Sequence, residues 1–358
     1  MPKSRNITRL SIAVVFGILC GVLGLVQNVA ADDARVMAIH PPEYGFFSKQ
    51  VAYEGIPIKA HTDVSDAALI EARQRLARML APIPVVVQNL VDVEAEMHVI
   101  GKNQQTSDLP YLRHRKGKPY ESHGKSVESI DQRTRGVGGI LASCGEENLL
   151  KLPSDRYTDH RDICTHEFAH TVLGYGLSPN VQEMVRRQFR KSTGAGLWKT
   201  AYASTNDDEF FAELSMWYFG SRGDFGQIAP QPQTGRAWLR SYDPEAYDLL
   251  DRIYSGRVPV ERITWQRIAP LPATDEAKLR SLSSQEPTAL LLVNRTSTDY
   301  SLFWLDFEGK RKPYGILHAG ENLVEHTFAT HPWLVARPDG RTVGIYVPGR
   351  LHGKAVLK

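Results

Sequence analysis

Apolar and polar residues alternate along the chain with two different periods, and each period predicts different elements. Residues 65–80 place apolar side chains at intervals of three and four, which predicts an amphipathic helix. Residues 205–220 begin with polar capping residues, carry acids in their first turn and end at a glycine, so a second helix is expected there. A shorter helix is expected at 244–255, and apolar runs bounded by glycine predict strands at 96–101 and 136–143.

The pattern of apolar and polar residues changes towards the C-terminus. Residues 289–350 are short alternating runs broken by the turn sequences DFEGK, HAGEN and RPDGR, a pattern typical of a small β-sandwich. We expect an α+β domain at 32–270, a linker at 271–288 and then this all-β sandwich. The polar stretch 102–135 is expected to form a long loop of unassigned role.

Residues 1–31 have the organisation of an export signal. Three basic residues precede an apolar run at 10–26, and small residues follow it. Cleavage and retention as an anchor both stay open, so we expect a secreted, periplasmic or otherwise extracellular protein, attached to a membrane only if 10–26 is retained. Removing these three bases leaves 40 basic and 40 acidic residues, from totals of 43 and 40. This balance gives no electrostatic reason to expect a nucleic-acid partner.

Export also changes the interpretation of the cysteines. Beyond the signal the chain has two, Cys144 and Cys164. An even pair in an oxidising compartment predicts one disulfide, with two buried free thiols as the alternative.

The sequence HEFAH supplies candidate metal ligands. His166 and His170 are four residues apart and therefore share one helix face, where two imidazoles can bind one zinc ion. Glu167 is offset around the helix and can reach a water molecule at the metal as general base. A third ligand must come from elsewhere, and Glu209 and Glu213 are candidates because they too lie four residues apart in an expected helix.

HEFAH followed by TNDDEFFAE resembles the catalytic domain of the anthrax lethal factor family of zinc peptidases. The resemblance implies a zincin-like fold, a mixed sheet with helices, in which a strand near 136–143 edges the cleft. It implies one Zn2+ per chain held by His166, His170 and Glu209, with Glu213 supporting the ligands. It further implies Glu167 as the base, Tyr202 as a catalytic tyrosine and a polypeptide as the substrate.

Two alternatives to a peptidase stay open. One is a non-enzymatic extracellular peptide-binding protein in which the zincin fold is structural. The other is a zinc hydrolase that cuts a non-peptide amide, because the same groups can perform that reaction.

The C-terminal run WLDFEGK, followed by PY and later by HPWL, resembles the von Hippel–Lindau β domain. The resemblance implies a pocket for a proline- or hydroxyproline-containing peptide. The positions that match this pocket are Trp304, Tyr314, His326, Thr327, His331 and Trp333. The alternative is that these aromatic residues simply form the core of the sandwich.

Overall fold

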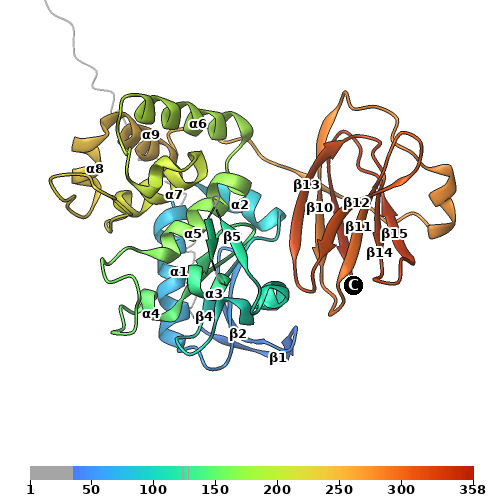
Figure 1. Cartoon of the computed structure of the whole chain (residues 1–358), viewed down its shortest axis with the longest axis horizontal. Helices are drawn as coiled ribbons and strands as arrows, with labels where there is room; N and C mark the ends of the chain where they lie inside the picture. Colours follow the sequence, from blue (N-terminus) through green and yellow to red (C-terminus); the bar gives the residue numbers. More distant parts are fainter. Residues whose placement is uncertain (1–34, 123–124, 128) are drawn as a thin grey trace, which may run out of the picture. The chain divides into compact units, whose positions relative to one another are not determined.

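The computed structural model describes residues 35–122, 125–127 and 129–358 (Figure 1). The expected export signal at 1–31 lies outside these residues. Within the described part of the chain, no helix is long and apolar enough to cross a membrane.

The N-terminal part is built on a six-stranded mixed sheet in the order β1-β2-β3-β4-β8-β7. Its strands are β1 (Met37–Glu43), β2 (Phe47–Tyr53), β3 (Ile56–Ala60), β4 (Glu96–Ile100), β8 (Leu141–Gly145) and β7 (Gly136–Val137). Strands β3, β4 and β8 are parallel, whereas β7 joins the edge of the sheet antiparallel to β8. The central strands are mostly buried, as expected for parallel strands covered on both faces, although β3 and β4 also carry Lys59, Glu96 and His98. The expected strand at 136–143 is therefore two strands, β7 and β8.

Helix α1 (Asp66–Leu80) confirms the helix predicted at 65–80. The hydroxyl of Ser65 accepts a hydrogen bond from the Ala68 amide and caps the first turn. The apolar stripe of α1 is buried, and the helix contacts β2, β3 and β4. Helix α1 thus covers these three strands of the sheet.

The two motif helices lie against each other. Helix α5 (Ile163–Thr171) contains HEFAH and continues into a π-helical turn (Val172–Gly176). It begins at Ile163 because the side chain of Asp162 accepts the Thr165 amide as a cap. Helix α7 (Asp207–Tyr218) is capped in the same way by Asn206 and contacts α5. Both helices confirm the sequence prediction.

Other helices complete the N-terminal part. They are α2 (Pro84–Asp92), α3 (Ile130–Arg133), α4 (Glu146–Leu149), α6 (Pro179–Gly194), α8 (Arg236–Tyr242) and α9 (Pro244–Tyr254). Helix α9 confirms the prediction at 244–255, whereas the sequence analysis did not predict α2, α3, α4, α6 or α8. The stretch 102–135 is not a plain loop, because it holds short 3-10 turns (Thr106–Asp108 and Pro110–Arg115), the hairpin β5 (Tyr120–Ser122) and β6 (Lys125–Val127), and α3.

The C-terminal part consists of two four-stranded sheets, which confirms the prediction of an all-β module (Figure 1). One sheet is β13 (Asn322–Phe328), β10 (Pro287–Asn294), β16 (His352–Leu357) and β9 (Trp265–Arg267). The other is β12 (Arg311–Leu317), β11 (Tyr300–Leu305), β14 (Trp333–Ala336) and β15 (Thr342–Tyr346). Part of the expected linker belongs to this module, since Leu271 bridges to Ile345 and the turn at Ala273–Lys278 contacts β15.

The expected disulfide is absent from the structure. Cys144 on β8 and Cys164 on α5 are free thiols with no solvent exposure, and their side chains are hydrogen-bonded to each other. Burial raises the pKa of the Cys144 thiol, and the hydrogen bond with Cys164 adds to the rise. The two elements are held here by core packing without a covalent link, so the alternative of two buried thiols describes this structure.

Candidate metal and catalytic centre

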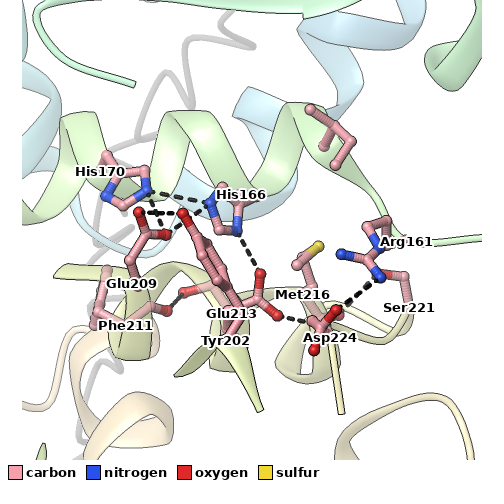
Figure 2. A network of polar contacts seen from close by, with 12 residues as sticks. Arg161, His166, His170, Tyr202, Glu209, Phe211, Glu213, Met216, Ser221 and Asp224 are labelled. Atoms are coloured by element: carbon pink, nitrogen blue, oxygen red, sulfur yellow. Dashed lines mark hydrogen bonds and ion pairs between the residues drawn. The ribbon is translucent and has the colours of Figure 1, made fainter. Parts of the chain in front are cut away.

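Three candidate ligands converge between α5 and α7 (Figure 2). The Nε2 atoms of His166 and His170 are 3.2 Å apart. Oε2 of Glu209 lies 3.2 Å from Nε2 of His166 and 3.4 Å from Nε2 of His170. Around a tetrahedral zinc ion with bonds of about 2.0–2.1 Å, neighbouring ligand atoms are about 3.3 Å apart. The three atoms therefore have the spacing of three corners of one zinc site.

Glu213 contacts His166 at Nδ1, the ring nitrogen that is not part of the triangle of candidate ligand atoms. Its Oε1 lies 3.1 Å from Nδ1 of His166, and the glutamate is only 2 % exposed. A carboxylate at Nδ1 keeps the proton there and leaves Nε2 free to bind a metal. Burial by itself would lower the pKa of His166, but the hydrogen bonds with Glu209 and Glu213 outweigh it and raise that pKa.

The support continues beyond Glu213. The backbone amide of Asp224 donates to Oε2 of Glu213, and the carboxylate of Asp224 lies 3.3 Å from Nη2 of Arg161 (Figure 2). Arg161 is also paired with Asp159. The sequence analysis did not identify Asp224 or Arg161, because neither lies in a motif and only the fold brings them to the ligand helices.

Glu167 lies on the cavity side of α5, one residue after the first ligand. Its side chain is 8 % exposed. A carboxylate oxygen of Glu167 and one ring nitrogen each of His166 and His170 all lie within 4.8 Å of one another. Burial raises the pKa of Glu167, although both histidines act to lower it. A raised pKa makes this carboxylate a stronger base, as a proton acceptor near neutral pH requires.

Tyr202 faces the same group from a short 3-10 turn (Tyr202–Ser204) before α7. Its hydroxyl donates to Oε1 of Glu209 at 3.1 Å and accepts from Nη2 of Arg133 at 2.9 Å. Burial, followed by the charge of Glu209, raises the pKa of the tyrosine, so the hydroxyl keeps its proton. Arg133 was also missed by the sequence analysis, since nothing in the polar stretch 102–135 distinguishes it.

These residues line a cavity of about 530 Å³, and residues 136–139 form another part of its wall. Edge strand β7 thus borders the cleft, which agrees with what the resemblance implied for the strand near 136–143. A Cβ atom added at Gly138 would lie 2.7 Å from Cβ of His170, and one at Gly136 would lie 2.8 Å from Cγ of Glu167. The glycines in this wall let the backbone approach the ligand helix closely.

The six matched positions of the β module fall into separate groups. Trp333 is buried and donates from Nε1 to Oγ1 of Thr327 at 3.0 Å. Tyr314 is 53 % exposed, and its ring meets that of Trp333 edge-on at 4.6 Å. The register explains this contact, because Pro313 and Gly315 pair with successive residues of β11 and leave Tyr314 as a bulge.

A second group surrounds His331, which is buried. Its ring packs 5.3 Å from that of Trp304, and its Nε2 is 3.4 Å from the hydroxyl of Ser284. Because Trp304 and Trp333 are opposite each other on β11 and β14, the two groups are neighbours. His326 is the exception: it is exposed on β13, and next to Thr327 it points to the other face of the strand. The structure therefore does not bring His326 to the others.

Comparison with protein families bears on this C-terminal part. Residues 279–343 match the family model described as VHL beta domain. The match includes all six matched positions and begins within the expected linker. The C-terminal module is therefore a VHL-like β domain.

Proposed function

We propose that this protein is an exported zinc metallopeptidase that carries a peptide-binding β domain. The observation that carries the proposal is the triangle of two imidazole nitrogens and one carboxylate oxygen with edges of 3.2–3.4 Å. Glu167 and Tyr202 at the rim of this triangle favour hydrolysis over a purely structural metal site, which would be closed by a fourth protein ligand.

His166, His170 and Glu209 would hold the zinc, which would polarise the peptide carbonyl and make a water molecule more acidic. Glu167 would accept the proton of that water and pass it to the nitrogen of the leaving amine. The Tyr202 hydroxyl would donate to the carbonyl oxygen as negative charge develops on it. Glu213 would keep the proton on Nδ1 of His166 throughout, so that the ligand keeps one tautomer.

The β domain would hold an extended peptide, and the exposed ring of Tyr314 beside Trp333 supports this role. Aromatic faces suit a proline ring, and the hydroxyl of Thr327 with the imidazole of His331 offers polar partners for a hydroxylated one. Tethering a substrate in this way would raise its concentration near the cleft without taking part in the chemistry.

The test is the zinc content of residues 32–358 beside the variant Glu209→Ala, with both proteins assayed on a mixed peptide library. Asp207→Ala is the matched control, because it removes an acid from the same helical turn but not from the triangle. We expect the parent protein and Asp207→Ala to hold one zinc per chain and to cleave peptides. Glu209→Ala should lose both zinc and cleavage.

Two outcomes would contradict the proposal. Zinc without cleavage of any peptide would point to a hydrolase of a non-peptide amide. Absence of zinc from the parent chain would leave a peptide-binding protein with a structural zincin-like domain.

A further inference from the structure

Arg133 lines the cleft and carries a positive charge. Among the described residues, no carboxylate forms an ion pair with it. Its Nη2 donates to the hydroxyl of Tyr202 at 2.9 Å, and its guanidinium carbon lies 5.8 Å from the centre of that ring. Other arginines nearby are neutralised: Arg135 is buried against Glu147, and Arg161 pairs with Asp159 and Asp224. The charge of Arg133 also acts on Glu167, where it helps to lower the pKa.

The chain fixes Arg133 in this place from its N-terminal side. It is the last residue of α3, whose first turn is capped by the hydroxyl of Ser129. The carboxylate of Asp131 accepts from both the amide and the hydroxyl of Ser107, at 2.8 and 2.7 Å. The guanidinium of Arg156 donates to the carbonyls of Asp131 and Gln132 at 3.2 and 3.1 Å.

The C-terminal side is fixed as well. The hydroxyl of Thr134 donates to the carbonyl of Gly136 at 2.7 Å, and Arg135 donates to the carbonyls of Gly101 and Gln104. Arg133 therefore stands between two anchored neighbours and the cleft wall at 136–139. These contacts hold the backbone on both sides of Arg133, whose guanidinium is hydrogen-bonded to Tyr202.

We propose that Arg133 is a positioning residue that acts through Tyr202, an inference that rests on the peptidase function proposed above. The tyrosine hydroxyl has one hydrogen to donate. In this structure the hydroxyl gives that hydrogen to Oε1 of Glu209, while Arg133 donates to the hydroxyl oxygen. Arg133 thus holds the hydroxyl in place without using its hydrogen, which would turn from Glu209 to the carbonyl oxygen of a bound substrate.

The central experiment is a double-mutant cycle with Arg133→Gln and Tyr202→Phe, measured as kcat and KM on a peptide that the zinc-loaded protein cleaves. Removing one donor to a developing oxyanion lowers kcat by roughly 100-fold or more, and we expect each single variant to fall in this range with little change in KM. The double variant should be no slower than Tyr202→Phe alone, because residues that act as a unit are not additive.

Arg133→Lys should recover part of the rate, because a lysine keeps the charge but loses the planar fork. Arg187→Gln is the matched control: this arginine is exposed on α6, outside the cleft, and its variant should behave as wild type. Zinc content and thermal unfolding must stay unchanged in Arg133→Gln, which separates a positioning role from a loss of fold. Losses that multiply in the double variant, or an unchanged kcat in Arg133→Gln, would overturn the proposal.

A competing role is an anchor for the terminal carboxylate of a substrate. The same peptide is therefore assayed with a free and with an amidated C-terminus. An equal loss of kcat on both supports positioning of Tyr202. A loss confined to the free acid overturns it in favour of the anchor.

A readout without zinc or turnover distinguishes failure of this inference from failure of the proposed function. Tyrosines labelled with fluorine at the 3-position give 19F signals, and the signal of Tyr202 is the one that disappears in Tyr202→Phe. In the metal-free protein, Arg133→Gln should shift this signal and Arg187→Gln should not. An unmoved signal would refute the contact, whereas a moved signal in a protein that cleaves nothing would refute only the peptidase function.

Discussion

The cleft of the N-terminal part and the pocket region of the β domain differ in how their candidate residues come together. In the cleft, candidate ligand atoms from α5 and α7 lie within 3.4 Å of one another, and the buried carboxylate of Glu213 contacts one of the histidines. In the β domain, the matched positions form two neighbouring groups and one outlier, His326. Residues four apart on a helix must share a face, whereas adjacent residues on a strand must not. Motif spacing therefore determines more of the first site than of the second.

The largest expected effect separates chemistry from metal binding in the cleft. Glu167→Gln removes the proposed proton acceptor but no candidate ligand of the triangle, so peptide cleavage should fall by about 10²–10⁴-fold. Zinc content, measured by elemental analysis, should stay at one per chain. Loss of zinc together with activity would instead make Glu167 a ligand and break the assignment of Glu209.

The glycine wall provides a test of how tightly the cleft is built. In Gly138→Ala the new methyl would lie 2.7–2.9 Å from three atoms of His170, so the side chain of this candidate ligand must move. We expect zinc affinity to fall by about 10–100-fold, as when a group that orients a ligand is removed. Competition with a chromophoric chelator measures it.

Gly174→Ala is the control for the wall. A Cβ at Gly174 meets nothing within 4 Å, and zinc affinity should stay at the wild-type value. Equal affinities for both variants would mean that the wall does not constrain His170.

In the β domain, an exposed and a buried member of the matched set should behave differently. Tyr314→Ala should leave the free energy of unfolding within about 0.5 kcal/mol, because the ring is half exposed, while weakening binding of a proline-containing peptide. Thr327→Val should lower the free energy of unfolding by about 1–3 kcal/mol, because it leaves the buried indole N–H of Trp333 without its acceptor. Denaturant unfolding and peptide titration measure the two effects.

Thr327→Ser keeps the hydroxyl and controls for the change in Thr327→Val. It should stay closer to wild type in stability. If Tyr314→Ala leaves peptide binding unchanged, the six matched positions do not form a peptide pocket and the aromatic residues serve only the sandwich.

The smallest effect is an acid sensitivity of the N-terminal part. Burial lowers the pKa of His98 below its ordinary value of 6.5, although its contact with Glu96 acts in the opposite direction. His98 therefore takes up a proton near pH 6.5 in the unfolded chain, but only at a lower pH in the folded chain. Stability is complete above that pH and declines as pH falls below it towards the lowered pKa, by at most about 1.4 kcal/mol per pH unit.

Replacing this histidine tests the effect. His98→Gln should flatten the pH dependence of the free energy of unfolding below pH 6.5, measured with denaturant. An unchanged slope would assign the acid sensitivity to other groups.

The motif helices could be predicted in detail because their signals are local. Helices α1, α5, α7 and α9, the caps at Ser65 and Asn206, and the alternation of the β domain all follow from residues within a few positions of one another. The candidate ligands His166 and His170 were identified in the same way, from their spacing on a helix. Spacing left Glu209 and Glu213 both open as the third ligand, and the family resemblance implied Glu209. The family match at 279–343 likewise agrees with the local resemblance noted in the sequence.

Contacts between distant segments were decided by the tertiary structure. Arg133 reaches the cleft from the four-residue helix α3, and Arg161 and Asp224 reach it from loops; none of these segments carries a periodic signal. The two thiols meet without a bond, and a bulge at Tyr314 turns that ring onto Trp333. Local spacing determines which side chains share a face, because that depends only on the helix or strand repeat. Which faces then meet depends on the packing of the whole chain, and this could not be inferred from any single segment.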